Sequence, residues 1–151
     1  MDTPIVTWHA KLMPEENYEP THSIFAGTCN YKQRIEVYLE LWNNRGGTDD
    51  VPDLYNFNIN VFFDTSEDVS LLKYCRVIVN EGTEMSLQLL DNYGIINFPT
   101  PQRLSGRHND GIAANNNDHI LRLKFIFEPP ADIRLKENDL KKLYFNIVDL
   151  N

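Results

Sequence analysis

The fold is decided by the stretch IEVYLELW at residues 35–42, in which aliphatic side chains alternate with other side chains. One parity is entirely aliphatic, whereas the other carries two glutamates, a tyrosine and a tryptophan. Successive side chains of a β-strand point to opposite faces, so this alternation is typical of a strand with one face towards a core. The stretch therefore predicts a β-strand that is half-buried.

The same alternation recurs on both sides of this stretch, separated by turn residues such as Glu81-Gly82. No window of a dozen residues keeps a helical period, and we allow one short helical turn at 136–143. With a weaker candidate at 24–28, eight or nine strands are predicted. The other predicted strands are residues 6–12, 55–63, 72–79, 85–90, 93–98, 119–127 and 143–150.

Many short strands with almost no helix predict an all-β fold, because two packed sheets allow each sheet to bury its apolar face. We expect an antiparallel β-sandwich or jelly roll of about eight strands, with long loops and at most one short helical turn. A closed barrel is the alternative. The length of 151 residues, without internal repeats or an extended linker, predicts a single β-sandwich domain over residues 1–151.

The composition indicates an acidic, soluble protein with a formal net charge of -8 and a pI of about 4.9. This charge disfavours nucleic acid and anionic lipid as partners, and no apolar run approaches the roughly 20 residues that span a bilayer. The first residues lack the pattern of a signal peptide. We therefore expect a cytoplasmic location or an assembled particle. Cys29 and Cys75 are expected to be thiols rather than a disulfide.

Two predicted loops are longer than a hairpin requires, namely residues 43–54 and 99–117, and long loops on a rigid scaffold commonly carry binding residues. Acidic residues in the first of these loops and in the following turn offer oxygen ligands that suit calcium. They also suit a simpler role in starting turns. The candidate calcium ligands are Asp49, Asp50, Asp53, Asp64 and Asp68.

Aromatic residues on the mixed face of residues 35–42 offer a carbohydrate platform, because Tyr38 and Trp42 share that face and Asn43 and Asn44 follow directly. The alternative is that this face is covered by a loop, a second sheet or a neighbouring subunit. The remaining candidate binding residues lie in the second long loop. They are Arg103, Arg107 and His108.

Catalytic constellations are weak in this sequence. Ser105, His108 and Asp110 lie close in one loop, but a triad needs residues held by different rigid elements. Glu36 and Glu40 share one strand face, where a solvated surface explains them better than a glycosidase pair. The four histidines lack metal-ligand spacing. We therefore predict no enzymatic activity and no cofactor.

The expected function is a non-catalytic structural or protein-interaction module, such as a subunit of a larger symmetric assembly in a virion, tail or secretion apparatus. Strand faces that are apolar or aromatic on both sides favour this hypothesis, because subunits bury such faces against their neighbours. Protein partners or self-association are then expected. The alternative function is a carbohydrate- or calcium-binding β-sandwich module.

Overall fold

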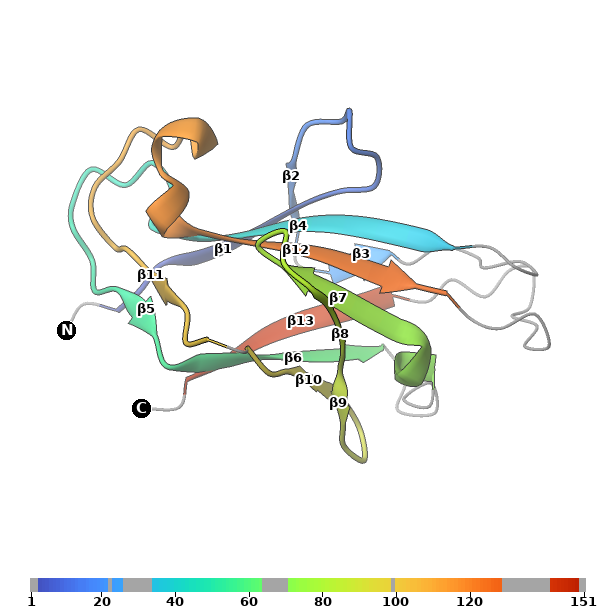
Figure 1. The fold of residues 1–151 in the computed structure, drawn as a ribbon. Coiled ribbons are helices and arrows are strands. Elements are labelled where there is room, and N and C mark those ends of the chain that lie inside the picture. The colour runs from blue at the N-terminus through green and yellow to red at the C-terminus, as the bar shows by residue number, and fades with distance from the viewer. Residues whose placement is uncertain are drawn as a thin grey trace.

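The computed structural model describes residues 3–21, 23–25, 34–63, 71–98, 100–128 and 142–149. The chain forms an all-β, antiparallel sandwich in which two sheets pack face to face, as the ribbon shows (Figure 1). The alternation in the sequence therefore predicted the fold class correctly. The pairing defines two open sheets rather than the closed barrel that was the alternative.

The larger sheet has six strands, with the long central strands β4 and β12 antiparallel to each other. In spatial order it contains β2 (Glu19–Thr21), β1 (Val6–Lys11), β4 (Ile35–Asn43), β12 (Ile120–Phe127), β7 (Cys75–Val79) and β8 (Glu84–Ser86).

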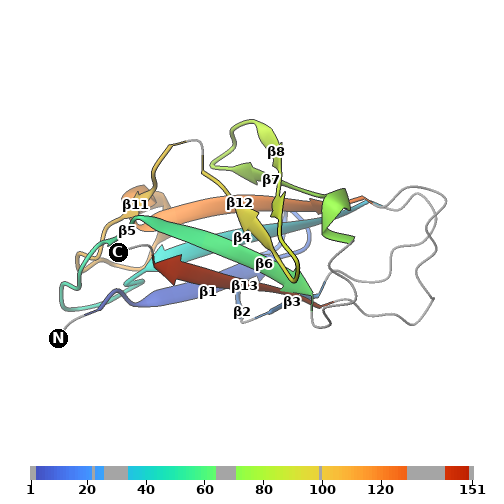
Figure 2. The ribbon, with the colours of Figure 1, turned by 90° about the horizontal axis from the view of Figure 1, so that it is seen from below.

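The smaller sheet has five strands, and β6 lies at its centre between β13 and β10. In spatial order it contains β3 (Ser23–Phe25), β13 (Lys142–Asp149), β6 (Phe57–Phe63), β10 (Gly94–Ile96) and β9 (Gln88–Leu89). A separate two-stranded ribbon joins β11 (Arg103–Leu104) to β5 (Leu54–Tyr55). Figure 2 shows the smaller sheet from below, with the larger sheet behind it.

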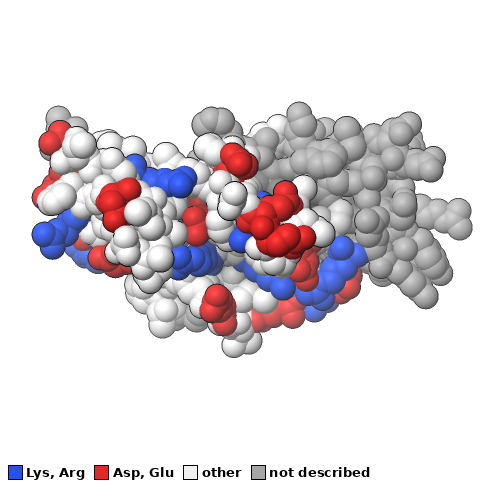
Figure 3. All heavy atoms as spheres, turned by 90° about the horizontal axis from the view of Figure 1, so that it is seen from above, with Lys and Arg blue, Asp and Glu red and all other residues white. Residues whose placement is uncertain are grey.

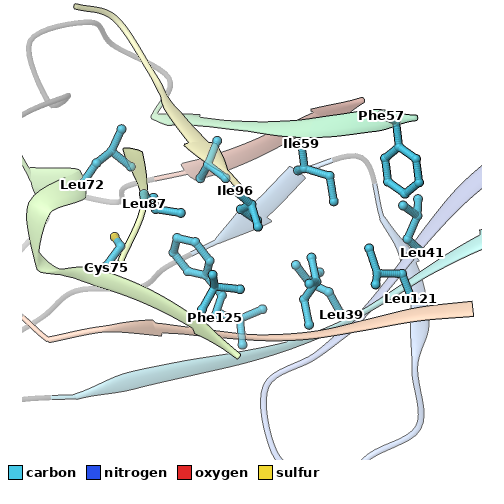
Figure 4. Packing of buried hydrophobic residues seen from close by; sticks show 14 of the residues in the cluster. Leu39, Leu41, Phe57, Ile59, Leu72, Cys75, Leu87, Ile96, Leu121 and Phe125 are labelled. Atoms are coloured by element: carbon cyan, nitrogen blue, oxygen red, sulfur yellow. The ribbon is translucent and has the colours of Figure 1, made fainter. Parts of the chain in front are cut away.

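The core lies between the sheets and follows the period-2 pattern of each strand. In β6, buried residues alternate with half-buried ones along the whole strand. In β4, Val37, Leu39 and Leu41 belong to the buried core. Figure 4 shows Leu39 and Leu41 pointing between the sheets, towards Ile59 of the facing sheet. The inward parity of residues 35–42 is therefore the one that the sequence predicted.

Local departures from the predicted elements have identifiable causes. Asn56, with a φ of 54°, separates β5 from β6 inside the predicted strand 55–63. The predicted strand 85–90 divides at Leu87, which is buried where the chain passes from the larger sheet to the smaller one. Very short strands bring the number of strands in the described residues to thirteen.

Helical structure is confined to short 3₁₀ turns in the described residues, including η2 (Ala113–Asn115) and η3 (Asn117–His119). The helical turn expected at 136–143 falls largely outside the described residues, and its last two positions belong to β13. In the described part of the chain, no helix has the length and apolar character needed to cross a membrane.

The two cysteines are only partly described. Cys75 is 1% exposed in the core, and its Sγ lies 3.9 Å from the carbonyl oxygen of Leu71. Cys29 lies outside the described residues. The expected thiol state of this pair therefore stays a prediction.

Candidate binding groove

The two long connections contact each other at one end of the sandwich (Figure 1), and we call residues 43–54 and 103–111 together the loop clamp. Asn43 is 0% exposed at the end of β4. Its Nδ2 donates to the carbonyl oxygen of Leu104 at 3.1 Å, and its Oδ1 accepts from the amide of Ile5 at 3.0 Å. This buried amide therefore joins three segments of the chain.

Asn44 continues the same pattern one residue later, with a φ of 58° that turns the chain out of β4. Its Nδ2 donates to the carbonyl oxygens of Asp49 at 2.8 Å and Gly106 at 2.9 Å. The loops approach so closely that a Cβ on Gly106 would lie 2.1 Å from the carbonyl oxygen of Val51. Asn43 and Asn44 therefore hold the loops together.

The acidic residues of the loop clamp are also bonded within it. Asp50 accepts from the amide of His108 at 2.8 Å, and the His108 ring nitrogen Nδ1 lies 2.7 Å away. Asp53 accepts from the amide of Gly106 at 2.9 Å and from Nε of Arg103 at 2.8 Å. These hydrogen bonds, the backbone ones first, lower the pKa of both carboxyl groups below the ordinary value.

The predicted calcium ligands are not brought together as a metal site in the part of the chain that is described. Asp49 contributes its backbone carbonyl to the loop clamp, and Asp64 and Asp68 lie outside the described residues. Among residues 3–21, 23–25, 34–63, 71–98, 100–128 and 142–149, no group of three His, Cys, Asp or Glu side chains is placed to hold a metal ion.

The loop residues that suggested a hydrolytic triad have separate local roles. Ser105 Oγ accepts from the amide of Arg107 at 3.3 Å, and Asp110 accepts from the amide of Ile112 at 3.0 Å. His108 bonds to the opposite loop, as described above. Among the described residues, no hydrogen bond joins the side chains of Ser105, His108 and Asp110 to one another. Arg107, one of the predicted binding residues, is exposed in the same loop.

Trp42 does not offer an exposed aromatic platform, because its side chain is 0% exposed. It lies on the outer face of the larger sheet, where the guanidinium of Arg45 sits 5.3 Å from its ring centre. Its Nε1 donates to Glu40 Oε1 at 3.1 Å. The ring is therefore unavailable for stacking on a sugar. This burial corrects the expectation that Trp42 forms a carbohydrate platform together with Tyr38.

His9 lies beside this cluster, 4% exposed on β1 and opposite Glu40 in the strand register. Arg45 Nη1 approaches its Nδ1 at 2.8 Å, and Thr7 Oγ1 lies 3.0 Å from its Nε2. Burial, aided by the charge of Arg45, lowers the pKa of His9 to about 4. The imidazole is therefore neutral at neutral pH.

The outer face of the larger sheet carries two adjoining hollows, of about 310 and 360 Å³, which we call the outer groove. Their linings share Arg122 and Glu81. Seen from above, this face carries basic and acidic side chains side by side (Figure 3). The residues that line the outer groove are Tyr18, Tyr38, Ile78, Asn80, Glu81, Gly82, Asn117, Ile120, Arg122, Leu123 and Lys124.

Two half-buried tyrosines form one side of the outer groove. Tyr18 comes from the connection between β1 and β2, which stands above the sheet (Figure 1), and Tyr38 comes from β4. Lys11 Nζ lies 4.4 Å from the Tyr18 ring centre and 5.8 Å from that of Tyr38. Cation–π contacts of this kind hold aromatic rings in a defined position.

Tyr38 is also held from below, because its hydroxyl donates to Glu36 Oε2 at 3.0 Å. Lys124 Nζ lies 3.4 Å from the same carboxylate. Burial by itself raises the pKa of Glu36, but the hydrogen bond from Tyr38 and the charge of Lys124 together bring that pKa below its ordinary value. Glu36 is therefore ionised at neutral pH.

Arg122 lies at the centre of the outer groove on β12, opposite Glu40 of β4. Its Nε is 3.5 Å from Glu40 Oε2, and the Glu40 side chain is only 6% exposed. Trp42 Nε1 holds the other oxygen of that carboxylate. Within the described residues, Nη1 and Nη2 of Arg122 have no hydrogen-bond partner, and the side chain is 34% exposed.

The opposite rim is the turn after β7, in which Asn80 and Glu81 have φ values of 50° and 60°. Asn80 extends the ladder beyond β7, because its amide donates to the Arg122 carbonyl at 2.8 Å and its Oδ1 accepts from the Arg122 amide at 3.0 Å. Glu81 follows in the left-handed region, which is strained for a residue with a Cβ. Its exposed carboxylate has no ion-pair partner among the described residues.

A third hollow, of about 440 Å³, lies at the edge between the sheets and is lined by Val79, Met85 and several amides. The amide groups already have partners, since Asn80 Nδ2 donates to Gln102 Oε1 at 3.3 Å and Asn97 Nδ2 donates to Gln88 Oε1. This hollow therefore offers a ligand fewer unused donors and acceptors than the outer groove, although it is larger.

Only one of the predicted binding residues, Tyr38, lines the outer groove. Arg122 and Lys124 were visible as the polar parity of a predicted strand, but no local pattern joins them to Tyr18 or Glu81. The strand register could have linked Arg122 to Glu40. Tyr18 and Glu81 reach the groove through connections whose paths the alternation does not specify.

Comparisons with protein-family models, with curated proteins and with solved structures found no match to this chain.

Proposed function

We propose that this chain is a non-catalytic binding module that recognises carbohydrate through the outer groove. One observation carries the proposal. Two half-buried tyrosines stand in the same hollow as Arg122, whose terminal nitrogens have no partner among the described residues. An aromatic ring packs against the C–H face of a sugar, while a few convergent polar groups fix the orientation of its hydroxyls.

Carbohydrate is favoured over an extended peptide because of where the groove lies. Its floor is formed by the central strands β4 and β12 together with β7, and these strands already bond to one another. A peptide that adds a strand needs a sheet edge with unpaired backbone groups. Recognition in the groove therefore depends on side chains. A sugar ring suits these side chains, because it packs against the tyrosine rings and its hydroxyl groups accept from the planar guanidinium.

A non-catalytic role is favoured by the state of the two glutamates beneath the groove. A glycosidase needs one carboxyl group with a raised pKa to act as general acid. Glu36 instead has a lowered pKa, and Glu40 is joined to both Arg122 and Trp42. Their contacts support a positioning role for Arg122 and Tyr38.

The experiment is calorimetric binding of a panel of oligosaccharides, neutral and uronic-acid-containing, to the full chain. Tyr18→Ala should weaken binding about fivefold, because a stacking contact contributes about 1 kcal/mol beyond burial. Tyr93→Ala is the matched control, since Tyr93 lies between β9 and β10 in the smaller sheet. Equal losses in both variants, or no binding by the wild-type chain, would contradict the proposal.

A structural or protein-interaction role, such as a subunit of a virion, tail or secretion apparatus, is the second candidate. The observation that favours it is the exposure of aliphatic side chains at the β1–β2 connection, where Leu12 is 49% and Met13 is 53% exposed. Light scattering across concentration tests it. A discrete oligomer that Leu12→Ser and Met13→Ser dissociate would favour this role, and a monomer at all concentrations would remove it.

A further inference from the structure

We infer that Arg122 and Glu81 form a donor–acceptor pair that reads neighbouring hydroxyl groups, so that the outer groove selects uncharged carbohydrate over acidic carbohydrate. This inference rests on the proposed function, because it names the ligand class and the specificity residues of the same groove. It goes further in one respect: the tyrosines explain why a sugar ring binds, whereas this pair decides which sugar does.

Arg122 and Glu81 share the outer groove without forming an ion pair. Arg122, from β12, and Glu81, from the turn after β7, line both hollows of the outer groove. They carry opposite charges, yet no ion pair within 4.0 Å joins them. Opposite charges that share a groove without contact leave room between them for a ligand group that bonds to both.

The guanidinium of Arg122 is positioned by its neighbours within the chain. Arg122 Nε forms an ion pair with the almost fully buried Glu40 at 3.5 Å, and Trp42 Nε1 donates to the other oxygen of that carboxylate. The backbone of Arg122 is fixed on both sides, by β4 and by the side chain of Asn80. A guanidinium held in this way presents its two terminal nitrogens as a rigid fork, and little rotamer freedom is lost when a ligand binds.

Glu81 lines the outer groove in an uncommon backbone conformation. Its φ of 60° is unfavourable for a glutamate, whereas a glycine adopts this conformation without strain. The sequence places a glycine only at the next position, Gly82. Residues held in sparsely populated conformations occur where the surrounding structure fixes them, often at ligand sites. Here the turn is closed by the amide of Gly82, which donates to the Val79 carbonyl at 2.9 Å. Glu81 is thereby held at the rim of both hollows.

The balance of charge in the outer groove favours an uncharged ligand. Arg122 and Lys124 already have buried or half-buried glutamates as neighbours. A ligand carboxylate would meet the unpaired carboxylate of Glu81, in a chain whose formal net charge is -8. A pair of neighbouring hydroxyls has no such conflict, because one hydroxyl accepts from the guanidinium and the other donates to the carboxylate.

The test compares a neutral oligosaccharide with a uronic-acid oligosaccharide of the same length, using the full chain. The wild-type chain should bind the neutral ligand at least tenfold more tightly, with little dependence on salt. Glu81→Gln should weaken the neutral ligand several-fold and bring the two affinities within about threefold of each other. Arg122→Lys, which keeps the charge but loses the fork, should weaken the neutral ligand about tenfold.

Glu84→Gln is the matched control, because it removes one negative charge from the β7–β8 hairpin at a position outside the groove lining. It should leave the preference unchanged. Equal binding of both ligands by the wild-type chain, or a preference that Glu84→Gln changes as much as Glu81→Gln, would overturn the inference and leave the proposed function standing. Binding of neither ligand would overturn both.

Discussion

The loop clamp and the outer groove contain the same kinds of polar side chain, but these side chains have different roles in the two regions. In the loop clamp, the amide of Asn44 bonds to carbonyl oxygens of two loops, and the carboxylate of Asp53 bonds to an amide and a guanidinium. In the outer groove, the terminal nitrogens of Arg122 and the carboxylate of Glu81 have no partner among the described residues. Long loops thus stabilise the fold here, and side chains on and beside strands remain available for binding.

Loop length and polar composition do not by themselves locate a binding site in this chain. Asparagine and aspartate bond readily to nearby backbone groups, so a loop rich in them can satisfy its own hydrogen bonds. In a central strand the backbone groups already bond to the neighbouring strands, so a side chain on the outer face finds few free backbone partners nearby. If this comparison is correct, substitutions in the loop clamp should change stability alone, and substitutions in the outer groove should change binding.

The largest expected effect is that of Asn44→Ala, because it leaves buried carbonyl oxygens without their donor and puts alanine at a positive φ. We expect a loss of about 3–4 kcal/mol of unfolding free energy. Asn44→Gly should lose about 1 kcal/mol less, because glycine adopts the left-handed region without strain. Urea denaturation of both variants measures these losses.

Asn92→Ala, at an exposed position between β9 and β10, is the control and should change stability by less than about 0.5 kcal/mol. Carbohydrate affinity, measured where each variant is folded, should stay at the wild-type value for Asn44→Gly. If that variant lost binding while Asn92→Ala kept it, the separation between the loop clamp and the outer groove would be wrong.

The next effect is a dependence of stability on pH that arises from His9. Its pKa is about 4 in the folded chain, against about 6.5 in an unfolded one. The stabilisation is therefore complete above the unfolded value and is lost as the pH falls towards the folded value. Between about pH 7 and about pH 5 the loss should be about 2 kcal/mol.

Denaturation of a His9→Gln variant across this range isolates the contribution, because glutamine keeps a polar group near Thr7 and Arg45 without titrating. The loss with falling pH should be about 2 kcal/mol smaller than in the wild-type chain. His108→Gln, at an exposed histidine of the loop clamp, is the control. A wild-type stability that is flat from about pH 7 to about pH 5 would show that His9 is not buried as neutral imidazole.

The sequence predicted the fold because alternation is a property of each strand alone. The buried parity of β6 and the inward positions Val37, Leu39 and Leu41 of β4 follow from the letters of those strands. The same reasoning placed Trp42 on the outer face, which is correct, and left open whether that face is an accessible platform or is covered. The structure divides the two outcomes, because Trp42 is buried and Tyr38 lines the outer groove. Arg45, which follows the strand, places its guanidinium 5.3 Å from the Trp42 ring centre, and the alternation within the strand does not encode this contact.

The candidate site was harder to predict, because its members come from four separate segments. Tyr38 was identified from its strand face, but Tyr18 lies in a polar connection without alternation. Glu81 was interpreted as part of a turn, and its position beside Arg122 depends on Asn80 extending the β7 ladder by its side chain. Contacts of this kind depend on tertiary structure, which a period in the sequence does not encode.

The smallest effect, and the sharpest for the comparison, is that of Glu81→Gly. Glycine relieves the strain of a positive φ but increases the freedom of the unfolded chain, so we expect a net gain of about 0.5–1 kcal/mol in unfolding free energy. The same change removes the acceptor at the rim and should weaken the neutral ligand several-fold. A variant that is more stable and binds less well would identify Glu81 as a residue whose strain serves binding.

Asn80→Gly, one residue earlier, makes the comparison decisive because Asn80 has a similar positive φ. Its side chain accepts from the Arg122 amide at 3.0 Å and therefore contributes to the ladder. Asn80→Gly should lower the unfolding free energy by about 1 kcal/mol, where Glu81→Gly raises it. If both changes stabilised the chain equally, Asn80 would be a turn residue only. If both destabilised it, the carboxylate of Glu81 would belong to the fold, and the outer groove would lose its acceptor.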